Sequence, residues 1–192
     1  MDHKPVAVCK GEISVSEAFP PCLPQGLKSL GVPVAPNRIP AGPACPHRCG
    51  HFGQQAGERF AVRNSGAMVV VEGCGANGCE YMTGGTAVVL GAVGQNFGAG
   101  MTGGMAFVYD PTDIFRLKVN PETVAWQRID HPHWENVMKE LVEEHVAETK
   151  SPLGARLLND WDREIEKVWQ VVPKEMLSRL PVPLSTAKAK TA

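Results

Sequence analysis

Residues 57–110 read GERFAVRNSGAMVVVEGCGANGCEYMTGGTAVVLGAVGQNFGAGMTGGMAFVYD, and this stretch repeats itself. The tetrapeptide MTGG at 82–85 returns at 101–104, a shift of 19 residues. The same shift superposes three further pairs: Val70 on Val89, Gly75 on Gly94 and Asn77 on Asn96. Short apolar runs that alternate with glycines at a fixed period are typical of a solenoid. A period near 20 is too short for a helix pair, so each repeat is predicted to be one β-rich coil.

The glycines of the repeat are predicted to form corners, where the chain needs positive φ or close backbone approach. Gly73-x-Gly75-x-x-Gly78 also fits the dinucleotide-binding fingerprint, but that fingerprint needs a helix that begins within it. The glycine pair at 84–85 would end such a helix early, so corners are favoured over nucleotide binding. The expected structural glycines are Gly66, Gly75, Gly78, Gly84, Gly85, Gly94, Gly100, Gly103 and Gly104.

Length and composition indicate one soluble domain. The chain has 192 residues, of which 43% are hydrophobic, and a net charge of −1. This neutral balance argues against a nucleic-acid or membrane-surface partner held by basic charge. No apolar run reaches the ~18 residues of a transmembrane helix or resembles a signal peptide, so a cytoplasmic protein is expected. The six cysteines would be thiols in a reducing compartment.

Residues 1–53 differ from the rest of the chain and are predicted to be irregular. Prolines recur throughout this segment, and proline disrupts both helices and central strands. Cys45 and Cys49 flank a histidine and are weak zinc candidates, but a zinc site needs four ligands. Cys74 and Cys79, the only later cysteines, lie within the repeat and are expected to be small buried residues. No metal site is therefore expected.

The glycine-rich β-helix is predicted over residues 54–130, with added strands near 115–119 and 124–129. Apolar residues at helical spacing then predict a helix over 133–149. A second helix is expected from Ser151 to about Val168, because Ser151 precedes a proline, as an N-cap does. Together 131–180 would form a helical hairpin that covers an open edge or end of the coils, and 181–192 a flexible tail.

Catalytic groups do not stand out along the chain. No Ser-His-Asp or Cys-His arrangement is evident, and none of the six histidines falls within residues 57–110. His145 lies on the apolar face of the predicted helix and is expected to be a packed side chain. We therefore expect no catalytic and no cofactor-binding residue. The fold class that follows is mainly β: a β-helix of about three coils, a C-terminal helical hairpin and an irregular N-terminal segment.

Long motifs in this chain resemble the C-terminal glycine-rich domain of glutamate synthase large subunits, the GXGXG domain. The resemblance covers about residues 54–180. In the coils it is carried by 56–67, 71–73, 77–85, 89–91, Gly94, Asn96, Phe97, 99–104 and 106–108. In the helical part it is carried by His145, Val146, Thr149, Ser151, Leu158, Trp161, Val172 and Pro173.

This resemblance implies a right-handed β-helix that braces two catalytic domains without taking part in chemistry. In such enzymes, NAD(P)H- or ferredoxin-dependent, an amidotransferase domain hydrolyses glutamine. A synthase domain with FMN and an iron–sulfur cluster then makes glutamate from 2-oxoglutarate. The implied partners are those catalytic domains and a small subunit, with no cofactor on this chain. Three alternatives remain: an independent β-helix interaction subunit of another oxidoreductase complex, a non-functional gene fragment, and a metal or nucleotide binder that uses Cys45, Cys49 or the glycine motifs.

Overall fold

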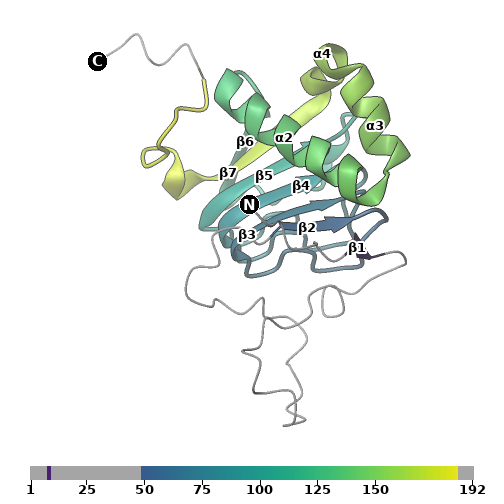
Figure 1. Ribbon diagram of the computed structural model, residues 1–192. Helices are drawn as coiled ribbons and strands as arrows, with labels where there is room; N and C mark the ends of the chain where they lie inside the picture. The colour runs from purple at the N-terminus through teal and green to yellow at the C-terminus, as the bar shows by residue number, and fades with distance from the viewer. Residues whose placement is uncertain (1–7, 10–48, 186–192) are drawn as a thin grey trace, which may run out of the picture.

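The computed structural model describes residues 8–9 and 49–185, which form one seven-stranded sheet covered by helices (Figure 1). The order across the sheet is β1-β2-β3-β4-β5-β7-β6. The strands are β1 (Val8–Cys9), β2 (Cys49–Phe52), β3 (Ser65–Val71), β4 (Thr83–Val89), β5 (Gly103–Tyr109), β6 (Val124–Arg128) and β7 (Val168–Pro173). The helices are α2 (Pro132–Thr149), α3 (Pro152–Asn159) and α4 (Trp161–Glu164), with short 3₁₀ turns η1 (Phe115–Leu117), η2 (Ile165–Lys167) and η3 (Lys174–Met176).

Strands β2 to β5 are parallel neighbours, and each corner loop carries the chain back to start the next strand beside the last. This arrangement is a β-solenoid of about three turns, so the predicted mainly β, β-helix class is confirmed. β2 lies within the segment that was expected to be irregular. Its four residues lack the glycine pattern of later coils, yet they pair with β3 at the same 19-residue shift, as His51 does with Val70.

The corner loops share one backbone shape. Every second residue across each corner has positive φ: Arg59, Ala61 and Arg63, then Asn77, Cys79 and Tyr81, then Asn96, Gly98 and Gly100. Left-handed conformation costs about 1–2 kcal/mol for an ordinary L-residue. Stacking offsets this cost, because each corner hydrogen-bonds to the next one. Arg59 N–H donates to Ala76 O at 2.8 Å, and Asn77 N–H donates to Gln95 O at 2.9 Å.

Three asparagines form a ladder of side-chain hydrogen bonds along the stacked corner loops. Asn96 Nδ2 donates to Asn77 Oδ1 at 2.9 Å, and Asn120 Nδ2 donates to Asn96 Oδ1 at 2.8 Å. Asparagine suits the position because its short polar side chain tolerates positive φ better than other non-glycine residues do. The hydrogen bond between their side chains therefore explains why asparagine recurs at positions 77 and 96 of the repeat.

Replacing Asn96 by alanine is expected to lower the free energy of unfolding by roughly 1–2 kcal/mol. The change removes both side-chain hydrogen bonds of Asn96 and leaves alanine at φ 61°. Urea denaturation measures the loss. Asn136→Ala is the control, because Asn136 is exposed on α2 and alanine favours helix. Equal stability of the two variants would show that the ladder contributes nothing.

The register within the strands differs by one residue from the repeat in the sequence. The 19-residue shift places Val70 on Val89, whereas in the sheet Val70 pairs with Val88. The difference arises at a bulge between Ser65 and Met68, where β3 contains one residue more than β4. A bulge inserts an unpaired residue and bends the strand. Before the bulge the strand pairing follows the 19-residue shift of the sequence, and after it the pairing follows an 18-residue shift.

Both faces of the sheet are buried. One face, with residues such as Val71, Val89 and Val108, points into the coils, where it meets Phe60 and Phe97 from the corners. The opposite face, with residues such as Val70, Val88 and Phe107, packs under α2 and α3, which contribute Met138, Val142 and Leu157 to this second cluster. Figure 1 shows these helices above the sheet and the corner loops below it. The helices thus cover a face of the sheet, whereas an edge or end of the coils was expected.

The C-terminal edge of the solenoid is closed by two antiparallel strands. β7 pairs with β5 on one side and with β6 on the other. The half-buried strand predicted near 124–129 is confirmed as β6. The second helix was expected to run to Val168, but α3 ends at Asn159 and Val168 begins β7, which satisfies the backbone of the β5 edge. Residues 115–117 form η1, whereas a strand was expected there.

Candidate functional site

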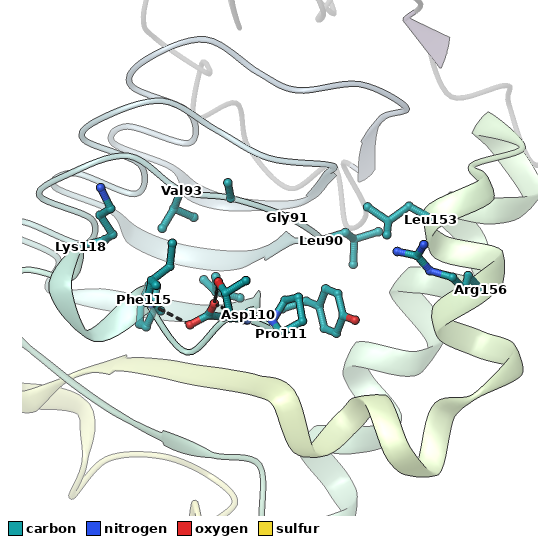
Figure 2. A pocket seen from close by; sticks show the side chains of 14 residues that line it. Leu90, Gly91, Val93, Asp110, Pro111, Phe115, Lys118, Leu153 and Arg156 are labelled. Atoms are coloured by element: carbon teal, nitrogen blue, oxygen red, sulfur yellow. Dashed lines mark hydrogen bonds between the residues drawn. The ribbon is translucent and has the colours of Figure 1, made fainter.

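The described structure contains a pocket with a cavity of about 250 Å³ beside the end of the solenoid (Figure 2). We call it the corner pocket. One wall is the loop that comes directly after β4, at residues 90–93. The second wall is the end of β5 with the turn after it, and the third is α3. Its lining is largely aliphatic or aromatic, and Lys118 and Arg156 bring the positive charges. The lining residues are Leu90, Gly91, Ala92, Val93, Val108, Tyr109, Asp110, Pro111, Thr112, Ile114, Phe115, Lys118, Leu153 and Arg156.

Asp110 shapes the floor of the corner pocket by holding the turn after β5. Its carboxylate accepts hydrogen bonds from Phe115 N–H at 2.7 Å, Thr112 Oγ1 at 2.9 Å and Trp169 Nε1 at 3.3 Å. Burial opposes ionisation, but these hydrogen bonds outweigh it and lower the pKa of Asp110. Asp110 is therefore an ionised structural anchor whose acceptor sites are occupied, so it has little capacity left for a ligand.

Tyr109 is likewise engaged. Its hydroxyl donates to the Glu164 carboxylate, and Glu164 also accepts from Lys167 Nζ at 2.7 Å. Burial and the bond to Glu164 raise the pKa of Tyr109 to about 12. A phenol with so high a pKa is a poor general base near neutral pH. The two cations of the pocket, Lys118 and Arg156, differ from these groups because neither forms an ion pair within the described part of the chain.

A pair of histidines lies buried between the sheet and α2. His51 comes from β2 and His145 from α2, and their ring centroids are 5.7 Å apart. None of their four ring nitrogens has a hydrogen-bond partner in the described structure. Burial lowers the pKa of His51, against the attraction of Glu144, whose carboxylate lies 3.5 Å away. Burial and His51 lower the pKa of His145 to about 4. The expectation that His145 packs in the core is confirmed.

Ser151 and Glu72 stand beside this pair without forming a catalytic set. Ser151 Oγ donates to the Glu72 carboxylate and accepts Gly154 N–H at 3.0 Å, as an N-cap does. His145 Nε2 lies 3.9 Å from Glu72 Oε1, beyond hydrogen-bond length. In a Ser-His arrangement the imidazole hydrogen-bonds to the serine hydroxyl, and neither ring nitrogen of His145 has a hydrogen-bond partner in the described structure. Ser151 caps α3, and its hydroxyl also donates to Glu72 of the coil, so this group links α3 to the solenoid.

The expected structural glycines all lie in strands or corners, with different degrees of crowding. A Cβ at Gly103, Gly85, Gly94 or Gly100 would come within 2.1–2.4 Å of another atom. At Gly104, Gly78, Gly84 and Gly75 the nearest atom would lie at 2.6–2.9 Å. At Gly66 a Cβ would meet nothing within 4 Å. Residues 76–81, after the Gly73-x-Gly75 pair, are turns and begin no helix, so the geometry of the dinucleotide fingerprint is missing.

Of the weak metal candidates, Cys45 lies outside the described residues, and Cys49 belongs to β2. Cys74 and Cys79 are buried thiols; burial raises the pKa of Cys74 to about 12 and that of Cys79 well above its usual value. Their placement in the core of the coils is the one expected. Within residues 8–9 and 49–185, no group of three metal-ligating side chains converges. Nor is any helix of that part long and apolar enough to cross a bilayer.

The corner pocket and His51 were missed by sequence reasoning. His51 lies 19 residues before Val70, so extending the repeat upstream would have placed it on the helix-covered face. The corner pocket has no comparable pattern. Lys118 follows η1 and Arg156 lies on α3, and only tertiary packing brings them to one cavity.

Comparisons with known proteins give the family. Residues 50–174 match the GXGXG motif family. A glutamate synthase large chain of the NADPH type from Azospirillum brasilense is 67% identical over 138 residues, which are 72% of this chain and 9% of that one. A ferredoxin-dependent chloroplastic glutamate synthase from Spinacia oleracea is 53% identical over 119 residues, 62% of this chain and 7% of that protein. The large chain of the NADPH type from Bacillus subtilis is 47% identical over 121 residues, 62% of this chain and 8% of that one.

The chain thus spans 9% or less of the length of these three relatives. The matched region includes the coils, their corners and the closing strands, which are the elements that define the fold. This chain belongs to the GXGXG motif family, and its glycine-rich solenoid is similar to the GXGXG region of glutamate synthase large chains.

Proposed function

We propose that this chain acts as a non-catalytic structural domain of a glutamate synthase, where it braces the amidotransferase and synthase parts. The parent reaction would make glutamate from glutamine and 2-oxoglutarate. The observation that carries this proposal is the 67% identity, over 138 residues, to a glutamate synthase large chain. The matched residues cover 9% of that protein, so the catalytic chemistry is assigned to the remaining parts.

The geometry supports a bracing role. Both faces of the sheet are buried, β6 and β7 close one edge, and the corners are bonded coil to coil. Such an element is rigid because its side chains have discrete packed arrangements. The polar groups that would attract attention as catalysts, namely Asp110, Tyr109 and Ser151, have hydrogen bonds that hold turns and helices in place.

The resemblance implies FMN and an iron–sulfur cluster in the parent enzyme, and we place both on its other parts. Iron–sulfur clusters are held by cysteine thiolates. Cys74 and Cys79 do not fit, because no third metal-ligating side chain converges on these two buried thiols within the described residues. The corner glycines open no helix whose N-terminus would receive a phosphate. The partners proposed are the catalytic domains and the small subunit of a cytoplasmic glutamate synthase.

The test is assembly in trans. The Azospirillum brasilense large chain, with its matched region deleted, is co-expressed with the full 192-residue chain carrying a purification tag. We expect the two to purify together and to form glutamate from glutamine and 2-oxoglutarate. This chain alone should show no glutamine-dependent turnover, and turnover by it would contradict the proposal.

A chimera separates failed folding from failed association. In the chimera, the matched region of this chain replaces the deleted region covalently. An active chimera combined with no assembly in trans would limit the proposal to covalently linked domains. An inactive but soluble chimera would reject the bracing role.

A further inference from the structure

The corner pocket has the size and shape of a receptor for inserted side chains. Its cavity of about 250 Å³ is below the roughly 300–1,000 Å³ typical of small-molecule sites. The upper wall is formed by Leu90 and Val93, and the lower by Pro111 and Phe115, as Figure 2 shows. One bulky apolar side chain, with its neighbours on the rim, would fill such a space.

The free charge of the corner pocket is positive. In Figure 2 Lys118 and Arg156 lie at opposite ends of the lining. Neither forms an ion pair within residues 49–185. The nearby Asp110 carboxylate, by contrast, already accepts four hydrogen bonds, two of them from Thr112. In the orientation of the Gln95 amide that satisfies both of its polar groups, the amide oxygen accepts a hydrogen bond from Lys118 Nζ at 3.1 Å. A partner that matches this field carries carboxylates.

An exposed apolar rim continues the corner pocket outward. Ile114, in the lining, is 46% exposed, and Leu117, on η1, is 78% exposed. Large apolar side chains that stay exposed next to a pocket mark interaction surfaces. A small free carboxylate would leave this rim uncovered, so the exposed side chains favour a protein segment.

We propose that the corner pocket receives a segment of the catalytic part of a glutamate synthase, in which a bulky apolar residue enters the cavity and flanking carboxylates meet Lys118 and Arg156. The inference rests on the proposed function, because it names the contact through which bracing occurs. The apolar anchor would supply most of the affinity, and the carboxylates would fix its orientation.

Charge reversal tests the proposal in the trans assembly described above. The double variant Lys118→Glu with Arg156→Glu should bind the deleted large chain at least tenfold more weakly, because it repels the carboxylates. The matched control reverses two exposed cations that do not line the corner pocket, Lys174→Glu with Arg179→Glu, and should stay within twofold of the wild type. Thermal melts confirm that both variants are folded, and Lys118→Gln with Arg156→Gln should show an intermediate affinity.

Cross-linking identifies the occupant. A benzophenone amino acid at Ile114 should form an adduct with a large-chain peptide that contains a bulky apolar residue next to Asp or Glu. Replacing that acid by lysine should then restore binding of the Arg156→Glu variant.

The outcomes are distinct. Wild-type assembly together with full-strength binding of the charge-reversed variant would overturn this inference and leave the bracing proposal intact. Adducts confined to this chain or to a second copy of it would also overturn the inference. If the wild-type chain does not assemble and the soluble chimera is inactive, both proposals fall.

Discussion

Alanine at Gly85 is expected to lower the free energy of unfolding by roughly 3–5 kcal/mol, the larger part of a marginal domain's stability. Gly85 has φ +85°, and its added Cβ would lie 2.2 Å from the Ala67 carbonyl oxygen. The obstacle is backbone of the neighbouring strand, so no side-chain rotation relieves it. The same Cβ would lie 2.9 Å from Asn64 Nδ2, which donates to that same oxygen at 2.8 Å.

Gly66→Ala is the matched control. Gly66 lies in β3, and a Cβ there would meet nothing within 4 Å. Its stability should stay within about 0.5 kcal/mol of the wild type. Thermal melts followed by circular dichroism compare the two. A loss of 3–5 kcal/mol corresponds to a fall in Tm of about 10 °C or more. If Gly85→Ala melts within 2 °C of the wild type, the backbone around Gly85 accommodates a Cβ, which contradicts the prediction.

The two glycines show how far the sequence predicts the coils. Both were expected to be structural, because each lies where the period places a glycine. The period predicts where coils turn, since corner geometry recurs with the repeat. It does not predict which glycine is crowded, because that depends on how closely the neighbouring coil packs against each one. Gly85 faces the bulged residues of β3 closely, whereas Gly66 faces open space.

Tertiary packing explains the elements that were predicted differently. Apolar residues from Leu153 to Val168 keep helical spacing, so one continuous helix was the natural prediction. Instead α3 ends at Asn159, the short helix α4 and the 3₁₀ turn η2 follow, and Val168 begins β7. The parallel edge of β5 needs hydrogen-bond partners, and β7 supplies them. The spacing of apolar residues does not show that β5 will have an unpaired edge, because this edge exists only once the solenoid has formed.

Acidification from pH 6.5 toward 4 is expected to lower the free energy of unfolding by roughly 3 kcal/mol through His145 alone. Burial and the neighbouring His51 lower the pKa of His145 from 6.5 to about 4. Between these two pH values His145 binds a proton in the unfolded chain but not in the folded protein. Stability therefore falls as the pH falls, and the loss is complete once the folded state is also protonated, near pH 4.

The surrounding groups define the useful pH window. His51 adds to the loss in the same direction, because burial lowers its pKa despite the attraction of Glu144. The lowered pKa values of Asp110 and Glu164 stabilise the fold above their unfolded values of 3.8 and 4.5, so their contribution is lost only at lower pH. Urea denaturation between pH 7.5 and 5.0 therefore reports mainly on the histidine pair.

His145→Leu isolates the effect. Neither ring nitrogen of His145 has a hydrogen-bond partner in the described structure, so an apolar side chain of similar size breaks no bond. At pH 7.5 the variant should match or exceed the wild type, since the buried polar ring is gone. Its stability should depend less on pH, with a slope reduced by up to about 1.4 kcal/mol per pH unit. The exposed Asn136→Ala variant, which removes no titratable group, should keep the wild-type slope. An equal slope in the His145→Leu and wild-type proteins would mean that the buried imidazole already binds its proton in the folded state.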